Sequence, residues 1–142
     1  MLLYKNNIIK LYMYLVYILQ SENLYYVGMT NNFLHRWMQH NNYLSGGARY
    51  TKKKDNWTPI CIIDGFITKS EAMQCEWKLK SKKNKLSKKY KGAIGRILYL
   101  KELLKMDQWT SNSPFIKDQN LKIYTISKYK GYFEDSNELE WF

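Results

Sequence analysis

The sequence predicts a small α+β domain, built on a short, mostly antiparallel three-stranded sheet that is flanked by helices. One observation is a pair of aromatic and branched segments, MYLVYIL (13–19) and LYYVGMT (24–30), joined by the turn-like QSEN, which is typical of an antiparallel hairpin. Another is the apolar run WTPICIIDGF (57–66), which predicts a third and largely buried strand. Helical patterns separate and follow these strands, which gives the order β-β-α-β-α-α with a tail.

Each helix has its own local signals. Thr30 and the two asparagines after it are N-cap candidates for a helix over residues 32–43. The capping-box pattern TKSE (68–71) begins a second helix, because its threonine and glutamate can bond each other's backbone N–H groups. AIGRILYLKELLKM (93–106) has strong helical periodicity and predicts a third helix, and LKIYTI (121–126) is one more strand candidate.

We divide the chain into a core over residues 1–92 and a C-terminal helix and tail over residues 93–142 that packs on it. The apolar N-terminal segment is broken by Lys5 and Lys10, so we expect neither a signal peptide nor a membrane span. The two cysteines lie in apolar surroundings without zinc-ligand spacing and are expected to be reduced thiols. Together these features predict a soluble, intracellular protein.

Positive charge dominates the composition. Lys and Arg number 23 against 12 acidic residues, a formal net charge of +11, and the excess lies between His35 and Lys105. Such a region favours a polyanionic partner, most simply nucleic acid, over an ordinary solvated face. Tyr43 and Tyr50, interleaved with basic residues, either stack on unpaired bases or pack their loop. The residues expected to contact DNA phosphates are Arg49, Lys52, Lys53, Lys54, Lys78, Lys80, Lys82 and Lys83.

Two helices supply candidates for chemistry. Glu76 lies about 40° from Ala72 around the second helix, in the middle of an apolar face. An ionised carboxylate there needs a metal ion, an arginine or a tyrosine hydroxyl as its partner. In the first helix, Arg36 and His40 are one turn apart and share a face, and the arginine fork suits a phosphate.

Tyr17 and Tyr26 stand on the two strands of the predicted hairpin. They share a face only if paired residues have numbers with an odd sum, which places Tyr17 opposite Tyr26 or Gly28. If the sum is even, the two side chains point to opposite faces. Cross-strand aromatic packing is the simpler explanation of the pair.

Taken in order, these pieces resemble the GIY-YIG nuclease superfamily over roughly residues 13–90. The matching pieces are VY (16–17), YVG (26–28), Arg36, QHN (39–41), GGARYT (46–51), Trp57 and Glu76 in EWKLK. Within the superfamily, the series most resembles the Slx-type structure-selective endonuclease subunit, followed by the small bacterial stand-alone GIY-YIG proteins. The order of the pieces, rather than any one of them, makes the match specific.

The resemblance implies a role for each matched position. Tyr17 and Tyr26 match the two motif tyrosines, of which one helps to activate the attacking water and the other contacts the phosphate. Which tyrosine does which differs between branches and stays open. Gly28 matches the glycine that allows a close backbone approach, and we count it with the cofactor-binding positions. Arg36 would hold the scissile phosphate, and His40 would assist the tyrosines or orient water.

The resemblance also implies that Glu76 binds one divalent metal per site, and Mg²⁺ or Mn²⁺ suits a carboxylate-only site. Such an ion stabilises the departing 3′ oxygen. The implied reaction is hydrolysis of phosphodiesters in branched DNA, meaning flaps, splayed arms and Holliday junctions. Leu15 replaces the glycine of the first motif, and Met29 replaces a lysine of some branches, which argues against a lysine-assisted mechanism.

Two other interpretations stay open. One is a non-catalytic nucleic-acid-binding module, which would have no need of Glu76 on an apolar helix face. The other is a subunit that is active only with a protein partner or as a homodimer, with the acidic segment GYFEDSNELEWF (131–142) as a docking segment rather than a packed terminus. The cellular Slx subunit carries a zinc-binding RING domain that two cysteines cannot form, so the need for the scaffold partner of those relatives is in doubt.

Overall fold

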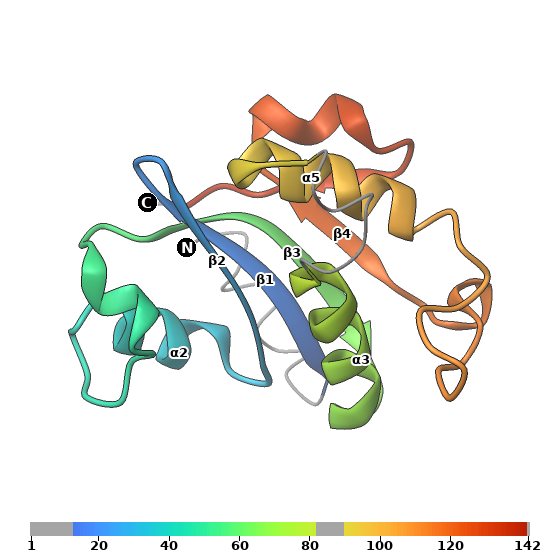
Figure 1. Ribbon diagram of the computed structural model, residues 1–142, viewed down its shortest axis with the longest axis horizontal. Helices are drawn as coiled ribbons and strands as arrows, with labels where there is room; N and C mark the ends of the chain where they lie inside the picture. The colour runs from blue at the N-terminus through green and yellow to red at the C-terminus, as the bar shows by residue number, and fades with distance from the viewer. Residues whose placement is uncertain (1–12, 82–89, 142) are drawn as a thin grey trace.

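A five-stranded sheet forms the centre of the fold, in a computed structural model that describes residues 13–81 and 90–141 (Figure 1). The strands are, in chain order, β1 (Tyr14–Ser21), β2 (Leu24–Thr30), β3 (Thr58–Phe66), β4 (Lys122–Thr125) and β5 (Ser136–Glu138). Their order across the sheet is β2-β1-β3-β4-β5. All neighbours are antiparallel except β4 and β5, which run parallel.

Helices cover the two faces of this sheet in different ways. They are, in chain order, α2 (Phe33–His40), η1 (Tyr50–Lys53), α3 (Lys69–Lys80), α5 (Gly92–Leu103), η2 (Ile116–Asp118) and η3 (Ser127–Tyr132), where η marks a 3₁₀ helix. α2 packs on one face, and α3 and α5 pack on the other. Figure 1 shows α2 and α3 on opposite sides of β1. Within the described ranges, no helix has the length and apolar character that crossing a bilayer requires.

β1 is buried on both faces of the sheet. Alternate side chains of a strand point to opposite faces, so Val16 and Ile18 join the cluster under α3 and α5. Leu15, Tyr17 and Leu19 join the cluster under α2. We call the first side of the sheet the apolar face. The second is the tyrosine face, whose buried cluster is Leu15, Tyr17, Leu19, Phe33, Trp57, Ile62, Tyr124 and Leu139.

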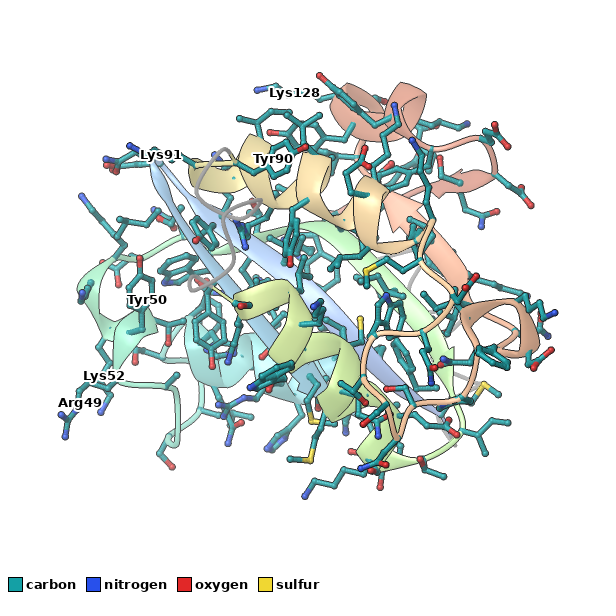
Figure 2. The ribbon with its side chains drawn as sticks, turned by 45° about the vertical axis from the view of Figure 1, so that its right-hand side comes forward. Arg49, Tyr50, Lys52, Tyr90, Lys91 and Lys128 are labelled. Carbon is teal, nitrogen blue, oxygen red and sulfur yellow. The ribbon has the colours of Figure 1, made fainter. Side chains whose placement is uncertain are left out.

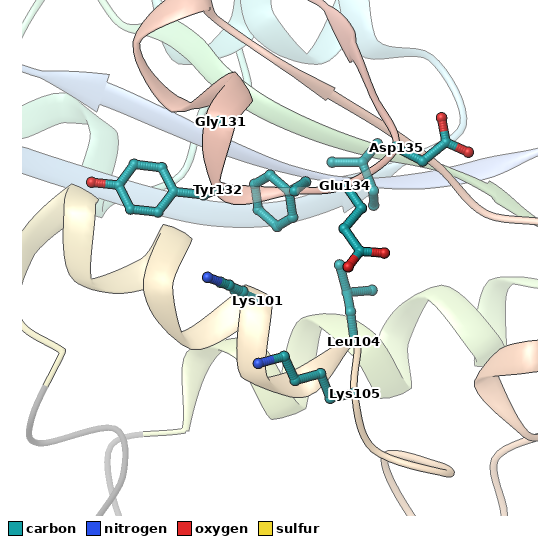
Figure 3. A pocket seen from close by; sticks show the side chains of 9 residues that line it. Lys101, Leu104, Lys105, Gly131, Tyr132, Glu134 and Asp135 are labelled. Carbon is teal, nitrogen blue, oxygen red and sulfur yellow. The ribbon is translucent and has the colours of Figure 1, made fainter.

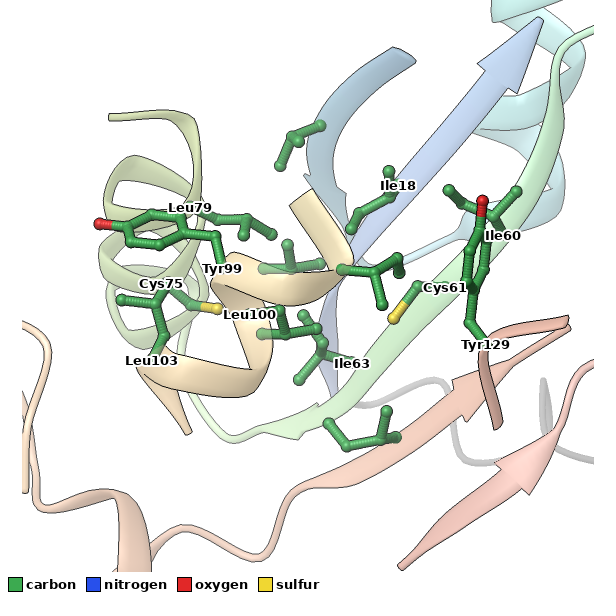
Figure 4. Packing of buried hydrophobic residues seen from close by; sticks show 14 of the residues in the cluster. Ile18, Ile60, Cys61, Ile63, Cys75, Leu79, Tyr99, Leu100, Leu103 and Tyr129 are labelled. Atoms are coloured by element: carbon green, nitrogen blue, oxygen red, sulfur yellow. The ribbon is translucent and has the colours of Figure 1, made fainter. Parts of the chain in front are cut away.

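The apolar face is an ordinary hydrophobic core. Figure 4 shows Leu79 of α3 packing toward Ile18 and Ile63 of the strands. Cys61 and Cys75 are buried in the same cluster and are free thiols, as the sequence predicts. Burial raises the pKa of both thiols, so neither is a thiolate near neutral pH.

Arg96 fixes the end of α3 relative to α5. Its side chain is buried, and its guanidinium donates hydrogen bonds to the carbonyls of Leu79 at 2.7 Å and Tyr90 at 2.8 Å. The same group lies 5.8 Å from the ring centre of Tyr25 and 5.1 Å from that of Tyr99. The last carbonyls of a helix have no partner within the helix, so Arg96 supplies one at the end of α3. The end of α3 is therefore tied to the helix beside it.

The residues after β5 pack against α2. Leu139 is buried in the cluster of the tyrosine face, and its N–H donates to the Thr125 carbonyl of β4 at 2.7 Å. The Trp141 ring meets Phe33 and Trp37 of α2 edge-on, with ring centres 5.4 and 5.1 Å apart. This part of the acidic segment thus supports the helix that carries Arg36 and His40.

The α+β class is confirmed, but the sheet is wider than the three strands predicted. β4 falls within the strand candidate at 121–126 and pairs with β3. β5 forms in the acidic segment and pairs with β4, although no alternating apolar pattern marks it as a strand. The predicted helices over 32–43 and 93–106 correspond to α2 and α5, which span 33–40 and 92–103.

A hollow of about 530 Å³ lies between α5 and the residues that follow η3 (Figure 3). Lys101 lines it from α5 and Lys105 from the turn after α5, and Glu134 and Asp135 line it from the other side. Of the predicted site residues that the structure describes, none is in this lining. The predicted chemistry lies instead on the tyrosine face and along the neighbouring edge of β2.

Candidate active site

Tyr17, His40 and Thr51 form a buried chain of hydrogen bonds on the tyrosine face. The Tyr17 hydroxyl lies 2.7 Å from Nε2 of His40, and Nδ1 of His40 lies 3.0 Å from Oγ1 of Thr51. The Thr51 hydroxyl donates to the Ala48 carbonyl at 2.9 Å, so it accepts from His40. Nδ1 of His40 therefore carries the proton, and Nε2 accepts a hydrogen bond from the Tyr17 hydroxyl.

The surroundings keep this chain neutral. Burial, followed by the positive charge of Arg36, lowers the pKa of His40 to about 4. Burial is also the main cause that raises the pKa of Tyr17, with Tyr26 adding to it and Arg36 opposing it. At neutral pH a phenol thus donates to a neutral imidazole, which is the proton arrangement that the hydrogen bonds require.

The pairing of β1 with β2 places the two tyrosines on one face. Tyr17 lies opposite Gly28, and Leu19 lies opposite Tyr26, so the residue numbers of each pair have an odd sum and both tyrosines point to the same face. The Tyr17 ring crosses directly over Gly28, where any Cβ would overlap the tyrosine hydroxyl and the ring carbon that bears it. The close approach expected at this glycine is therefore made by the Tyr17 side chain.

Tyr26 lies beside the buried chain and is half-buried itself. Its ring centre is 4.9 Å from that of His40 and 6.2 Å from that of Tyr50, on which it stacks. Tyr50 therefore packs against the site, and its stacking on an unpaired base stays a prediction. Burial raises the pKa of Tyr26 most, the charge of Glu76 raises it further, and Arg36 lowers it. Burial thus opposes the ionisation of Tyr26 most, and the charges of Arg36 and Glu76 act on it in opposite directions.

Arg36 projects from the middle of α2 and is half-buried. Its guanidinium donates to the Gln39 side-chain oxygen and to the Gly46 carbonyl, each at 2.9 Å. Gly46 has a φ of 98°, in the left-handed region that favours glycine, and a Cβ there would press on Gln39. The loop after α2 thus holds the guanidinium near both tyrosines, whose pKa values its charge lowers.

Glu76 faces β2 from α3. Its side chain is 22% exposed, and Oε1 lies 3.9 Å from Nζ of Lys80 in the next turn. Burial raises the pKa of Glu76, whereas the charge of Lys80 and a hydrogen bond from the Met29 backbone lower it. The carboxylate is thus partly removed from water, and a neighbouring cation favours its charged form.

The predicted position of Glu76 in the middle of an apolar helix face is wrong. Ala72, Cys75 and Leu79 are buried, but Met73 is 49% exposed, so the buried face does not extend to the far side of Glu76. At about 40° from Ala72, Glu76 lies at the rim of this face. A rim position explains why the carboxylate is partly buried and yet accessible.

A divalent cation fits Glu76 as its protein ligand. Among residues 13–81 and 90–141, no three His, Cys, Asp or Glu side chains gather into a metal-binding group. Mg²⁺ keeps several of its waters, however, and needs only one or two carboxylates together with substrate phosphates. A half-buried carboxylate whose pKa is raised by burial is a group that such a cation stabilises.

Asn41 and Trp57 brace the hydrogen-bonded chain, a role that sequence reasoning missed. Oδ1 of Asn41 accepts from the Trp57 backbone N–H at 2.7 Å, and Nδ2 of Asn41 donates to the Trp57 carbonyl at 3.1 Å. The Trp57 indole donates to the Thr51 carbonyl at 2.8 Å. These bonds tie the end of α2 to η1 and β3, which keeps Thr51 within reach of His40. The residues stand in the matched pieces QHN, GGARYT and Trp57, but spacing does not reveal their partners.

The predicted basic loop lies next to this site. Figure 2 shows Arg49 and Lys52 extending from its outer side. Nζ of Lys53 lies 4.5 Å from the Tyr50 ring centre, and Lys54 forms an exposed ion pair with a glutamate in the hairpin turn. The loop therefore presents positive charge beside Tyr50 and the tyrosine face.

The other predicted DNA-contacting residues follow Glu76. Lys78 and Lys80 lie in the last turn of α3. Lys82 and Lys83 lie outside the described residues. Since successive residues of a helix differ by about 100°, Lys78 and Lys80 project from different sides of α3.

The chain matches the GIY-YIG catalytic domain over residues 13–91, a range that contains all five predicted catalytic residues. It is also similar to structure-specific endonuclease subunit SLX1 of Phaeosphaeria nodorum, with 43% identity over 68 residues that cover 45% of this chain and 19% of that protein. The SLX1 homologue of Giardia intestinalis is 40% identical over 58 residues, which cover 41% of this chain and 16% of that protein. Slx1 of Schizosaccharomyces pombe is 34% identical over 98 residues, which cover 63% of this chain and 36% of that protein.

These matches confirm the resemblance that the order of motif residues indicates. They span between 16% and 36% of the lengths of the three relatives. The similarity is therefore one of domains, centred on the hairpin, α2, β3 and α3, which are the elements that carry the candidate site.

Proposed function

The chain belongs to the GIY-YIG family, and from this premise we propose that it is a metal-dependent, structure-selective DNA endonuclease. In this proposal it hydrolyses phosphodiesters in branched DNA, namely flaps, splayed arms and Holliday junctions. The observation that supports it most is the grouping of half-buried Tyr26 and Glu76 with the charge of Arg36 beside the neutral Tyr17–His40 pair.

Tyr26, rather than Tyr17, meets the attacking water in this mechanism. Tyr17 is 1% exposed and its hydroxyl is engaged with His40, whereas Tyr26 is only half-buried. A tyrosine acts as a base only when ionised; burial raises the pKa of Tyr26 above its ordinary value, and the charge of Arg36 opposes that rise. The Tyr26 phenolate takes a proton from water, the hydroxide attacks phosphorus, and the bond from phosphorus to the 3′ oxygen breaks. The 3′ oxygen leaves with the bonding electron pair and takes a proton from solvent, which gives a 3′-hydroxyl and a 5′-phosphate.

The remaining residues position the substrate and the base. Arg36 binds the scissile phosphate, because its fork donates two parallel hydrogen bonds to phosphate oxygens and keeps its charge. Glu76 would hold a single Mg²⁺ or Mn²⁺, which when bound supplies Lewis-acid stabilisation of the negative charge that develops on the phosphate. The His40 ring packs against Tyr26 and so orients its phenol.

The preference for branched DNA rests on two supports. The relatives are named structure-specific endonuclease subunits. The basic residues of the loop and of the last turn of α3 are suited to phosphates and carry no base code. The relatives' name also supports a protein partner, which we propose as a regulator or scaffold of this activity.

Cleavage of defined DNAs by the purified protein tests this proposal. Labelled flap, splayed-arm, four-way-junction and plain duplex DNA are incubated with and without Mg²⁺, alongside Glu76→Gln. We expect metal-dependent cutting of branched DNA, reduced at least about a hundredfold in Glu76→Gln because the metal loses its protein ligand. Glu102→Gln is the matched control, since this carboxylate pairs with Lys105 on α5 instead.

Three outcomes separate the alternatives. Equal cutting of all four DNAs would remove the structure selectivity. Binding of all four without cutting would favour the non-catalytic module, unless a partner protein restores cleavage. Cutting that survives both Glu76→Gln and the removal of metal would refute the mechanism.

A further inference from the structure

Lys80 reaches into the candidate active site, unlike an ordinary DNA-contacting lysine on a helix surface. Its Nζ lies 3.9 Å from Oε1 of Glu76, one turn earlier in α3. The same ammonium lies 5.3 Å from the ring centre of Tyr26, which belongs to β2. Lys80 thus contacts the two residues to which the proposed function assigns the metal and the attacking water.

The contact with Tyr26 distinguishes this arrangement from a simple ion pair along a helix. A glutamate and a lysine four residues apart often pair on helix surfaces and contribute little. Here the ammonium also lies over an aromatic ring of another element, where the electron-rich face attracts it. Glu76 itself is held from the β2 side by the Met29 backbone. The carboxylate therefore lies between a fixed backbone donor and a movable cation.

We propose that Lys80 is the internal cation of this site, which neutralises Glu76 until a divalent metal ion displaces its ammonium from the carboxylate. This inference rests on the proposed function in that Glu76 is the metal ligand. Two cations about 4 Å apart repel each other, so the ammonium and the metal ion compete for one carboxylate. The Lys80 side chain is 44% exposed and flexible, so it leaves Glu76 without any change in the fold.

Metal binding without DNA tests the competition. Mn²⁺ is titrated into the protein and binding is followed by isothermal calorimetry or by the electron-spin signal of free Mn²⁺. Lys80→Met keeps a long side chain and removes the charge, and we expect Mn²⁺ to bind it about two- to fivefold more tightly than the wild type. Lys78→Met is the matched control in the same turn and should bind like the wild type. Glu76→Gln should lose the site.

A second measurement follows the ammonium itself. The ring ¹H–¹³C signals of Tyr26 are recorded by NMR during titration with Mg²⁺. In the wild type these signals shift as the ammonium leaves the ring. In Lys80→Met they should start from a different position and move much less, whereas Lys78→Met should follow the wild type.

The inference fails if Lys80→Met binds Mn²⁺ no more tightly than the wild type, or if Mg²⁺ moves the Tyr26 signals equally in both proteins. It also fails if no variant binds Mn²⁺. Neither readout uses cleavage. If Lys80 and the metal ion compete for Glu76 but the protein does not cut DNA, only the proposed function is refuted. If the wild type cuts DNA but Lys80→Met binds metal as the wild type does, only the role of Lys80 is refuted.

Discussion

The two faces of the sheet are buried to a similar extent but are held together by different interactions. Under α3 and α5, side chains such as Ile18, Ile63 and Leu79 meet through apolar contacts. Under α2, Tyr17 and His40 are equally buried but are joined by a chain of hydrogen bonds. Burial alone therefore does not distinguish the face that carries chemistry. A chain of buried side chains that bond one another does, whereas buried Arg96, between α3 and α5, donates to backbone carbonyls.

This difference teaches how a small sheet supports a reactive site. The apolar face stabilises the fold in a way that does not depend on protonation. The tyrosine face buries polar groups, which stabilise the fold only when they have hydrogen-bond partners. Thr51 is the partner of His40, and Asn41 and Trp57 hold Thr51 in place through backbone and side-chain bonds. We therefore expect changes at Tyr26 to affect activity more than stability, and changes in the apolar face to affect stability more than activity.

The largest effect is expected from removal of the Tyr26 hydroxyl. Tyr26→Phe keeps the ring packed on His40 and removes the group proposed to accept the proton, so kcat/KM for a flap substrate should fall about 10²- to 10⁴-fold. The melting temperature should change little, because the ring contacts remain. Tyr43→Phe, at a tyrosine that is 66% exposed, is the control and should keep full activity. A loss smaller than tenfold in Tyr26→Phe would show that Tyr26 is not the base.

The opposite result is expected on the apolar face. Ile63→Ala removes a fully buried side chain of β3 from the core under α3 and α5, and the cavity it leaves should lower the free energy of unfolding by about 2–5 kcal/mol. At a temperature where the variant stays folded, kcat should remain within about twofold of the wild type. Denaturant unfolding and cleavage assays on the same sample measure both quantities. A drop in kcat as large as that of Tyr26→Phe would mean that the two faces are coupled.

The smallest effect concerns acid. His40 has an ordinary pKa of 6.5 when unfolded and about 4 when folded, so between these values the unfolded chain binds a proton that the folded chain does not. The contribution of His40 to the free energy of unfolding is fully present above pH 6.5. It falls as the pH drops toward 4, by on the order of 3 kcal/mol in total. Unfolding of His40→Gln across this range should lack that part of the acid sensitivity.

The second histidine offers a matched control for this acid effect. His35 is exposed on the same helix, so His35→Gln should keep the acid sensitivity of the wild type. If His40→Gln loses stability with falling pH as steeply as His35→Gln does, buried neutral His40 is not the cause.

Hydrophobic periodicity and local turn and capping residues were enough to predict the hairpin, the capping box of α3 and the strand that corresponds to β4. The capping box holds in full, since Thr68 accepts from the Glu71 N–H and Glu71 accepts from the Thr68 N–H. β5 could not be predicted, because a three-residue strand of polar residues is defined by its partner rather than by its own pattern.

The candidate site, like the fold, could be predicted from the sequence only in part. The order of motif residues indicated Arg36 and Glu76, but helical periodicity misplaced Glu76, because the exposure of Met73 depends on which helices cover α3. The proton arrangement of His40 also lay beyond the sequence. It follows from a hydrogen bond between Thr51 and the carbonyl of Ala48, three residues earlier, and the irregular loop that makes this bond has no periodic signal.

The crossing of the Tyr17 ring over Gly28 also limits the order in which these two positions can change. While a ring occupies position 17, every side chain at position 28 meets it, so glycine cannot be replaced first. Loss of the ring would free position 28 but would break the hydrogen bond to His40. A lineage that keeps the hydrogen bond from Tyr17 to His40 must therefore keep tyrosine at position 17 and glycine at position 28 together.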